Sequence, residues 1–192
     1  MKIPKLNLQF HAAITAEEFP LANIARVEII TEEEVPKEYR LTDVATDAES
    51  IAYLSQGEEK SIRVKNVIKA QNKTEDIVMG YDTKLVSATM VPEVFALVDG
   101  GTWSPVTKKY EAPPIGTPVN RVPFTMNIYT EEKDGDGSTK SYVKFTYKNC
   151  KGTPVNFIFK DGEFFVPEFT VKSRPKLGEK PVTFEILEEL PA

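Results

Sequence analysis

The chain has 192 residues, 41% of them hydrophobic and 28% charged, which suits one domain with a sizeable core and is too short for two full domains. Its 24 basic and 29 acidic residues give a net charge of −5 without a basic block, which argues against a protein that grips nucleic-acid phosphates. No apolar run approaches the roughly 20 residues of a membrane span and the N-terminus lacks a signal-peptide pattern, so we expect a soluble protein that folds in a reducing cytoplasm.

The first third of the chain carries few strand signals. Residues 1–21 alternate only weakly between apolar and polar side chains, which predicts an arm or an edge strand. Residues 24–30 are a better strand candidate, because four aliphatic side chains lie among them just before an acidic run. From residue 31 to residue 60 no strand pattern persists, so we expect a long loop. A loop of that length in a compact domain is usually functional or disordered.

A hairpin is expected next. Residues 61–72 and 76–90 have the apolar and β-branched content of two long strands, and Lys73 and Thr74 supply a short polar turn between them. The second strand then runs directly into the clearest helix signal of the sequence.

The segment PEVFALVDGG predicts a short helix over about residues 92–99. Proline is tolerated in a first helical turn, and Glu93 places negative charge at the positive end of the helix dipole. The apolar residues form one stripe, while glycine after the last turn takes the left-handed conformation without steric cost. Because two turns of helix are marginal alone, the stripe is expected to pack on a sheet. The residues assigned to packing or ending this helix are Pro92, Val94, Phe95, Leu97, Val98, Gly100 and Gly101.

Alternating apolar side chains dominate the rest of the chain. A strand beginning at Thr102 precedes a proline-broken connection that a central strand could not accommodate. Further alternations predict strands at residues 122–128, 143–147, 155–159, 165–171 and 182–186, with hairpin turns at DGDG and Asp161-Gly162. Strands joined by tight turns without crossover helices favour a mainly β fold, an antiparallel two-sheet β-sandwich or barrel with one short flanking α-helix and a long loop.

Catalytic, metal and cofactor sites are not indicated. His11 is the only histidine and Cys150 the only cysteine, which leaves no Cys/His zinc site, no catalytic triad and no internal disulfide. Phosphate-binding glycine motifs are absent, and the DGDGS run lacks the closing glutamate of a calcium loop. Paired glutamates such as Glu131 and Glu132, or Glu163 and Glu168, together with Trp103, leave a carbohydrate-binding or glycosidase-like sandwich open as an alternative.

Seven stretches follow one another from about residue 60 to residue 191: VSATM, PEVFALVDGG, TW…KYEAPPIG, VPFTMNIYT, SYVKFTYKNCKGTPV, KDGEFFVPEF and SRPKLGEKPV. In this order they resemble the major tail proteins, or tail tube proteins, of long-tailed bacteriophages. The most specific part is the order strand, short helix, Gly-Gly, strand, followed by the aromatic-rich KNCKG and DGEFFVPEF runs.

This resemblance implies a structural virion protein that is not an enzyme. Copies would form hexameric rings that stack into the tail tube, with the helix on the flank and DNA passing through without specific binding. The implied partners are the chain itself and other tail proteins, namely the tape measure, terminator and distal tail proteins, with assembly in the host cytoplasm and no membrane. Residues 1–192 would then be a single domain with 1–21 as an arm and 31–60 as the loop that reaches a neighbouring subunit.

Two sets of residues follow from this hypothesis. An acidic channel would let DNA slide because like charge disfavours binding, and the candidates to line it are Glu28, Glu32, Glu33, Glu34, Glu75 and Asp76. The candidates for contact between rings are Tyr39, Leu41, Ile51, Tyr53 and Leu54. Two alternatives stay open: another tail or secretion-type tube protein such as a terminator, and a non-catalytic carbohydrate- or receptor-binding β-sandwich module.

Overall fold

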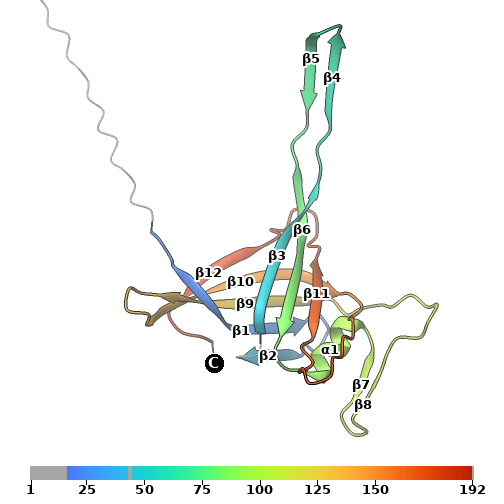
Figure 1. Cartoon of the computed structure of the whole chain (residues 1–192), viewed down its shortest axis with the longest axis vertical. Coiled ribbons are helices and arrows are strands. Elements are labelled where there is room, and N and C mark those ends of the chain that lie inside the picture. The colour runs from blue at the N-terminus through green and yellow to red at the C-terminus, as the bar shows by residue number, and fades with distance from the viewer. Residues whose placement is uncertain (1–16, 43–44, 192) are drawn as a thin grey trace, which may run out of the picture.

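A computed structural model describes residues 17–42 and 45–191 of the chain (Figure 1). These residues are mainly β with one short helix, as the sequence predicts. The elements are β1 (Leu21–Thr31), β2 (Glu38–Thr42), β3 (Ala45–Ser55), β4 (Glu59–Val64), β5 (Val67–Lys73), β6 (Ile77–Ser87), α1 (Pro92–Asp99), β7 (Thr102–Ser104), β8 (Lys109–Glu111), β9 (Phe124–Lys133), β10 (Thr139–Gly152), β11 (Glu168–Ser173) and β12 (Thr183–Leu187).

The body of the molecule is one antiparallel eight-stranded sheet folded into two layers. Its strand order is β2-β1-β9-β10-β11-β6-β3, and β12 also pairs with β10. Strand β10 belongs to both layers, because residues 142–146 pair with β12 while Cys150–Gly152 pair with β11. The predicted antiparallel architecture is therefore confirmed, with its two layers joined through β10 and the barrel left open.

The core lies between these layers and beneath the helix. Because strand side chains alternate between faces, one layer contributes Val27, Ile29, Met126 and Ile128, and the other contributes Leu85, Phe169 and Val171. Helix α1 adds Val94, Phe95 and Val98, each at most 1% exposed. Burying each such side chain contributes about 1.5–3 kcal/mol, so this cluster is the main source of stability in the body.

Helix α1 begins and ends where the sequence predicts. Pro92 is its first residue, and Gly100 follows it in the left-handed conformation at φ 86°, donating its N–H to the Ala96 carbonyl at 2.9 Å. The helix lies so close to β10 that a Cβ on Gly152 would come within 2.2 Å of the Val98 carbonyl oxygen. A glycine at that position permits the contact.

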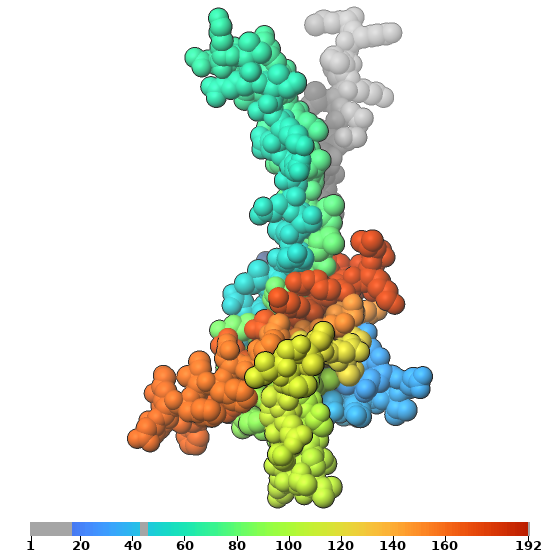
Figure 2. All heavy atoms as spheres, turned by 90° about the vertical axis from the view of Figure 1, so that its right-hand side faces the viewer, coloured from blue at the N-terminus to red at the C-terminus, as the bar shows by residue number. Residues whose placement is uncertain are grey.

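A long two-stranded ribbon rises from the body (Figures 1 and 2). Strands β3 and β6 pair from the body outward to Ser55 and Ile77, and β4 and β5 continue beyond them. The hairpin turn lies at Lys65 and Asn66, so the predicted turn at Lys73 and Thr74 is wrong. The sequence carries a signal for the true turn, because the alternation of apolar residues changes phase between Val64 and Val67.

Two other predictions need correction. Residues 31–60 are not one long loop, since they contain β2 and β3. Residues 155–167 form no strand; instead the rings of Phe157, Phe159 and Phe165 stack on one another with centroids 5.1–6.5 Å apart.

The strand expected after Thr102 is a small separate hairpin, β7–β8. The N-terminal arm or edge strand predicted at residues 1–21 falls largely on residues 1–16, which lie outside the described residues. Strand β1 begins at Leu21.

Candidate functional site

The outer part of the ribbon is the first candidate site. We call residues 56–76, beyond the last β3–β6 pair, the arm. Every residue of β4 and β5 is exposed, and the apolar side chains of Ile62, Val64, Val67 and Ile68 are 51–64% exposed. Apolar side chains gathered on a projecting element mark a surface that contacts another molecule.

Hydrogen bonds hold the two chains of the arm together at its base, next to the body. Thr74 donates its N–H to the Glu58 carbonyl at 3.0 Å and accepts the Glu58 N–H on its hydroxyl at 2.7 Å, and Asp76 accepts the N–H of Gly57 at 2.8 Å. A Cβ on Gly57 would lie 1.8 Å from the Thr74 carbonyl oxygen. The two chains therefore cross closely at this joint, which fixes where the arm leaves the body.

Charge is divided between the arm and the rest of the chain. Strands β4 and β5 and their turn, residues 59–73, carry five basic residues (Lys60, Arg63, Lys65, Lys69 and Lys73) and one acidic residue, a net charge of +4. Because the whole chain carries −5, the remainder carries −9. The arm as a whole also contains Glu58, Glu75 and Asp76, so its net charge is +1 and its positive charge is concentrated on β4, β5 and their turn.

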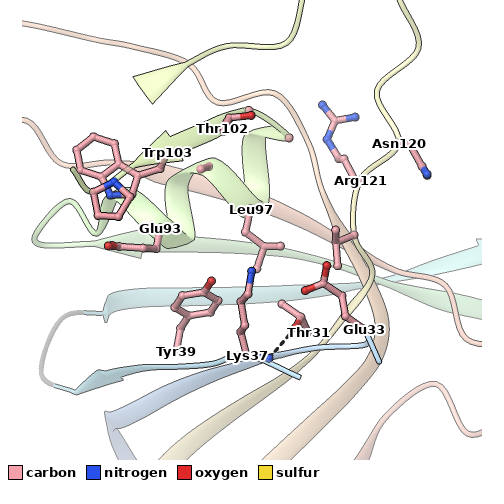
Figure 3. Close-up of a pocket in the computed structure, with 15 residues that line it drawn as sticks. Thr31, Glu33, Lys37, Tyr39, Glu93, Leu97, Thr102, Trp103, Asn120 and Arg121 are labelled. Carbon is pink, nitrogen blue, oxygen red and sulfur yellow. Dashed lines mark hydrogen bonds between the residues drawn. The ribbon is translucent and has the colours of Figure 1, made fainter. Parts of the chain in front are cut away.

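A groove lies beside α1 (Figure 3), and Figure 1 shows α1 and β7 at the end of the body opposite the arm. It has a volume of about 460 Å³ and runs between α1, the β1–β2 turn and the start of β7. Its lining residues are Thr31, Glu33, Lys37, Tyr39, Glu93, Ala96, Leu97, Gly100, Gly101, Thr102, Trp103, Pro105, Asn120, Arg121 and Val122.

The groove combines aromatic, aliphatic and acidic side chains (Figure 3). Glu93 and Leu97 enter it from α1, and Glu33 and Tyr39 from the opposite side, with Trp103 at one end. Lys37 and Arg121 are the cations of the lining, and Arg121 donates from Nη2 to the Asp99 carbonyl at the helix C-terminus at 3.0 Å. That bond places the guanidinium against the negative end of the helix dipole.

The acidic residues expected at a channel have different surroundings. Glu28 is buried, 3.2 Å from Nη2 of Arg26, and accepts a hydrogen bond from the Tyr129 hydroxyl at 2.7 Å. Burial and this carboxylate raise the pKa of Tyr129. Glu28 therefore does not face solvent, contrary to the expectation from its place on the strand. The position of Glu28 in the sequence could not reveal that Tyr129 of β9 packs against its carboxylate.

The other acidic candidates are exposed. Glu32, Glu33 and Glu34 lie in the β1–β2 turn, where Glu32 accepts the Asn149 N–H at 3.1 Å. Glu75 and Asp76 lie at the joint of the arm, far along the ribbon from that turn. The structure therefore does not gather the six predicted residues at one surface.

The five residues expected between rings also separate. Leu41 is 3% exposed in the core, and Tyr39 lines the groove. Ile51, Tyr53 and Leu54 are 41–60% exposed on β3, where the ribbon leaves the body. The guanidinium carbon of Arg174 lies 4.1 Å from the centre of the Tyr53 ring, a cation–π contact that supports the ribbon's base.

The helix residues are found against the core or at the groove. Val94, Phe95 and Val98 are buried, Leu97 and Gly101 line the groove, and Pro92 and Gly100 bound the helix.

Sequence reasoning missed Asp99, which accepts hydrogen bonds from the Tyr110 hydroxyl and the Val155 N–H. Burial, then this bond, raises the pKa of Tyr110. No sequence signal links Asp99 to those partners, which are 11 and 56 residues away.

Glu131 and Glu132, one of the carboxylate pairs considered from the sequence, differ in their surroundings. Glu131 accepts a hydrogen bond from Asn23 at 2.7 Å, while the neighbouring Glu132 is buried and accepts hydrogen bonds from Ser141 and from the exposed Lys140. These contacts lower the pKa of both carboxyls. Within the described residues, no group of His, Cys, Asp and Glu side chains could hold a metal ion. No helix among them has the length and apolarity needed to cross a bilayer.

Comparison with solved structures gives low similarity over nearly the whole chain. A chain of the structure of the anti-feeding prophage cap, the cap that terminates its tube, matches with a TM-score of 0.40 and 12% identity, covering 93% of this chain and 99% of that chain. A chain of the six-fold symmetrised anti-feeding prophage baseplate matches with a TM-score of 0.36 and 10% identity, covering 92% and 97%. Comparison with protein families gives no match, and neither does comparison with curated proteins.

Proposed function

We propose that this chain is a structural subunit of a phage-tail-like tube. Copies of it assemble into hexameric rings, and the rings stack into a tube through which DNA passes without specific binding. The six-fold number and the passage of DNA come from the resemblance of the sequence to tail tube proteins, whereas the tendency to self-assemble is argued from the surfaces of the molecule.

The arm is the observation that carries this proposal. A two-stranded ribbon in water is marginally stable by itself, and this one exposes apolar side chains along β4 and β5 with no core beneath them. Such an element is stabilised when it lies against another molecule. A chain whose arm contacts the next copy forms a head-to-tail interface, and interfaces of that kind generate rings or filaments.

The free edges of the sheet support the same proposal. Strands β2 and β3 end the path of the sheet, and β12 pairs along only one side. Unpaired edge strands can add a strand from a neighbouring copy. Side-by-side pairing of this kind would hold subunits within a ring, while the arm reaches out of its plane.

The acidic body suits a channel for DNA. The residues outside β4, β5 and their turn carry a net charge of −9, and like charge disfavours binding of phosphate, so DNA can slide. In this role the chain needs no cofactor, metal or catalytic residue. Its partners are other copies and the tail proteins that start, measure and end the tube, with assembly in the host cytoplasm and a final place in the virion tail.

Electron microscopy of the purified protein at rising concentration, with light scattering on the same samples, tests this function. The matched variant replaces residues 56–76 with Asn-Gly, because Ser55 and Ile77 are already paired and a two-residue turn can join them. We expect hollow tubes or stacked rings from the full chain and folded, unstacked subunits from the variant. A full chain that stays monomeric throughout, or a variant that still forms long tubes, would contradict the proposal.

The groove gives a specific reason to test a carbohydrate-binding module as the second candidate. Trp103 and Tyr39 offer aromatic faces for a sugar ring, and Glu33 and Glu93 can accept its hydroxyl hydrogen bonds. Glycan-array binding by the monomeric protein that disappears with Trp103→Ala would favour this candidate over the tube.

A further inference from the structure

We propose that the groove beside α1 is the receptor for the arm tip of another copy of this chain. This inference rests on the proposed self-assembly and adds the surface that receives the arm. The tip consists of Val64 to Val67, with Arg63 and Lys69 beside it. The receptor residues that matter most are Glu33 and Glu93, with Tyr39, Leu97 and Trp103 between and around them (Figure 3).

Complementary charge is the first argument. Residues 59–73 carry +4, whereas the groove lining holds two acidic side chains, Glu33 and Glu93, beside Lys37 and Arg121. Glu32 and Glu34 flank Glu33 in the exposed β1–β2 turn and add negative charge beside the groove. Because Arg121 is engaged by the helix C-terminus, an incoming cation meets a mainly acidic surface.

Chemical match is the second argument. The arm offers Val64 and Val67 at its turn, flanked by Arg63 and Lys65, and the groove offers Leu97 for apolar contact. The rings of Tyr39 and Trp103 can accept a lysine or guanidinium cation over their faces. The tip thus offers aliphatic and basic side chains, and the groove offers aliphatic, aromatic and acidic ones.

The positions of the two surfaces are the third argument. The arm extends from one end of the molecule, and α1, β7 and the groove lie at the other (Figures 1 and 2). A tip on one copy can therefore enter the groove of the next while its own groove receives a third. Repetition of this contact stacks subunits along one direction, as a tube requires.

Charge reversal with reciprocal rescue tests the proposal. We expect Glu33→Lys with Glu93→Lys to raise the concentration at which the protein assembles by at least tenfold. Combining that variant with Arg63→Glu and Lys65→Glu should restore assembly, because the charges again oppose each other. The control Glu163→Lys with Glu179→Lys makes the same change in net charge at exposed loops outside the groove and should assemble like the unmodified chain.

Disulfide trapping supplies a direct second readout. In a Cys150→Ala background, a Lys65→Cys protein mixed with a Glu93→Cys protein should yield crosslinked heterodimers. A Lys65→Cys protein mixed with a Glu163→Cys protein should not. If the full chain assembles but groove reversal has no effect and no heterodimer forms, the receptor assignment is overturned while self-assembly stands. If the full chain never assembles, the proposed function itself fails.

Discussion

Phe95 is the side chain on which most of the helix packing depends. It is fully buried, and its ring centroid lies 5.0 Å from that of Tyr110, 5.4 Å from Phe157 and 6.3 Å from Phe169. It therefore links the helix to β8, to the stacked aromatic segment and to β11. Tyr110 in turn donates to Asp99, so one aromatic residue positions a buried polar contact.

Truncation of this ring should destabilise the subunit strongly. Phe95→Ala removes a fully buried aromatic side chain, and we expect the free energy of unfolding to fall by about 3–5 kcal/mol in urea titrations. The control is Phe164→Ala, whose side chain is 97% exposed and whose removal should change stability by less than about 0.5 kcal/mol. Equal stability of the two variants would show that the helix is not clamped through Phe95.

Cys150 predicts a dependence of stability on alkaline pH. Burial raises the pKa of its thiol from 9.0 to about 12. The unfolded thiol ionises first as pH rises, so the contribution present below pH 9 is lost between pH 9 and about 12, by up to about 1.4 kcal/mol per pH unit. Urea titrations across this range should show a shallower loss for Cys150→Ala. The unmodified chain and Cys150→Ala contain the same tyrosines, which therefore contribute equally to both curves. If the two proteins lose stability with the same slope between pH 9 and about 12, the raised pKa of the thiol is contradicted.

At the scale of elements, two glycines allow neighbouring backbones to pack closely. The helix meets β10 at Gly152, and the two chains of the ribbon cross at Gly57. In both places a side chain would enter space already filled by a carbonyl oxygen. These glycines position α1 on the core and the arm on the body, and both surfaces proposed for assembly depend on them.

Gly152→Ala should therefore push α1 away from β10. The added methyl would lie 2.2 Å from a backbone oxygen that cannot rotate aside, and we expect a loss of roughly 1–3 kcal/mol in the free energy of unfolding. Gly135→Ala is the matched control, because a methyl added there, in the β9–β10 turn, would have nothing within 4 Å of it. Thermal melting of both variants checks this, and unchanged melting of Gly152→Ala would contradict it.

The sequence predicts the buried elements of this fold better than the exposed ones. Helix α1 and the strands of the core are predictable because burial on one face imposes a period on apolar residues. Strands β4 and β5 expose both faces to solvent, so their apolar alternation marks no core side, and the sequence predicts strand structure at residues 61–72 without placing the turn correctly. The groove could not be predicted for another reason: Tyr39, Glu93 and Trp103 come from three elements whose meeting depends on tertiary packing.

At the scale of the whole molecule, charge is sorted along the long axis. Residues 59–73, with a net charge of +4, lie at the opposite end of the molecule from α1, whose Glu93 lines the groove (Figure 1). Under the proposed assembly, the positive end of one copy attracts the acidic residues of the next copy, whereas copies placed side by side repel each other through their net negative charge. Side-by-side contacts must then be supplied by strand edges and apolar side chains, such as Phe184 and Ile186 on β12, which are 70% and 47% exposed.

Assembly should consequently weaken with salt. The distance over which charges act falls from about 10 Å at 0.1 M salt to about 3 Å at 1 M, so the attraction between arm and groove is screened. We expect the concentration needed for light scattering by assemblies to rise several-fold between 0.1 M and 1 M sodium chloride. The Glu33→Lys, Glu93→Lys variant should show a much smaller rise. Assembly that strengthens with salt would instead indicate a contact dominated by apolar burial.

The pairing of β6 with β11 gives the ribbon a mechanical role. Six residue pairs, from Glu168↔Val86 to Ser173↔Tyr81, run parallel to the direction in which the ribbon leaves the body. A pull on the arm tip loads these hydrogen bonds together, in shear, rather than opening them one after another. Tension on the arm is then passed through β11 and β10 into both layers of the body, so many hydrogen bonds share the load at once.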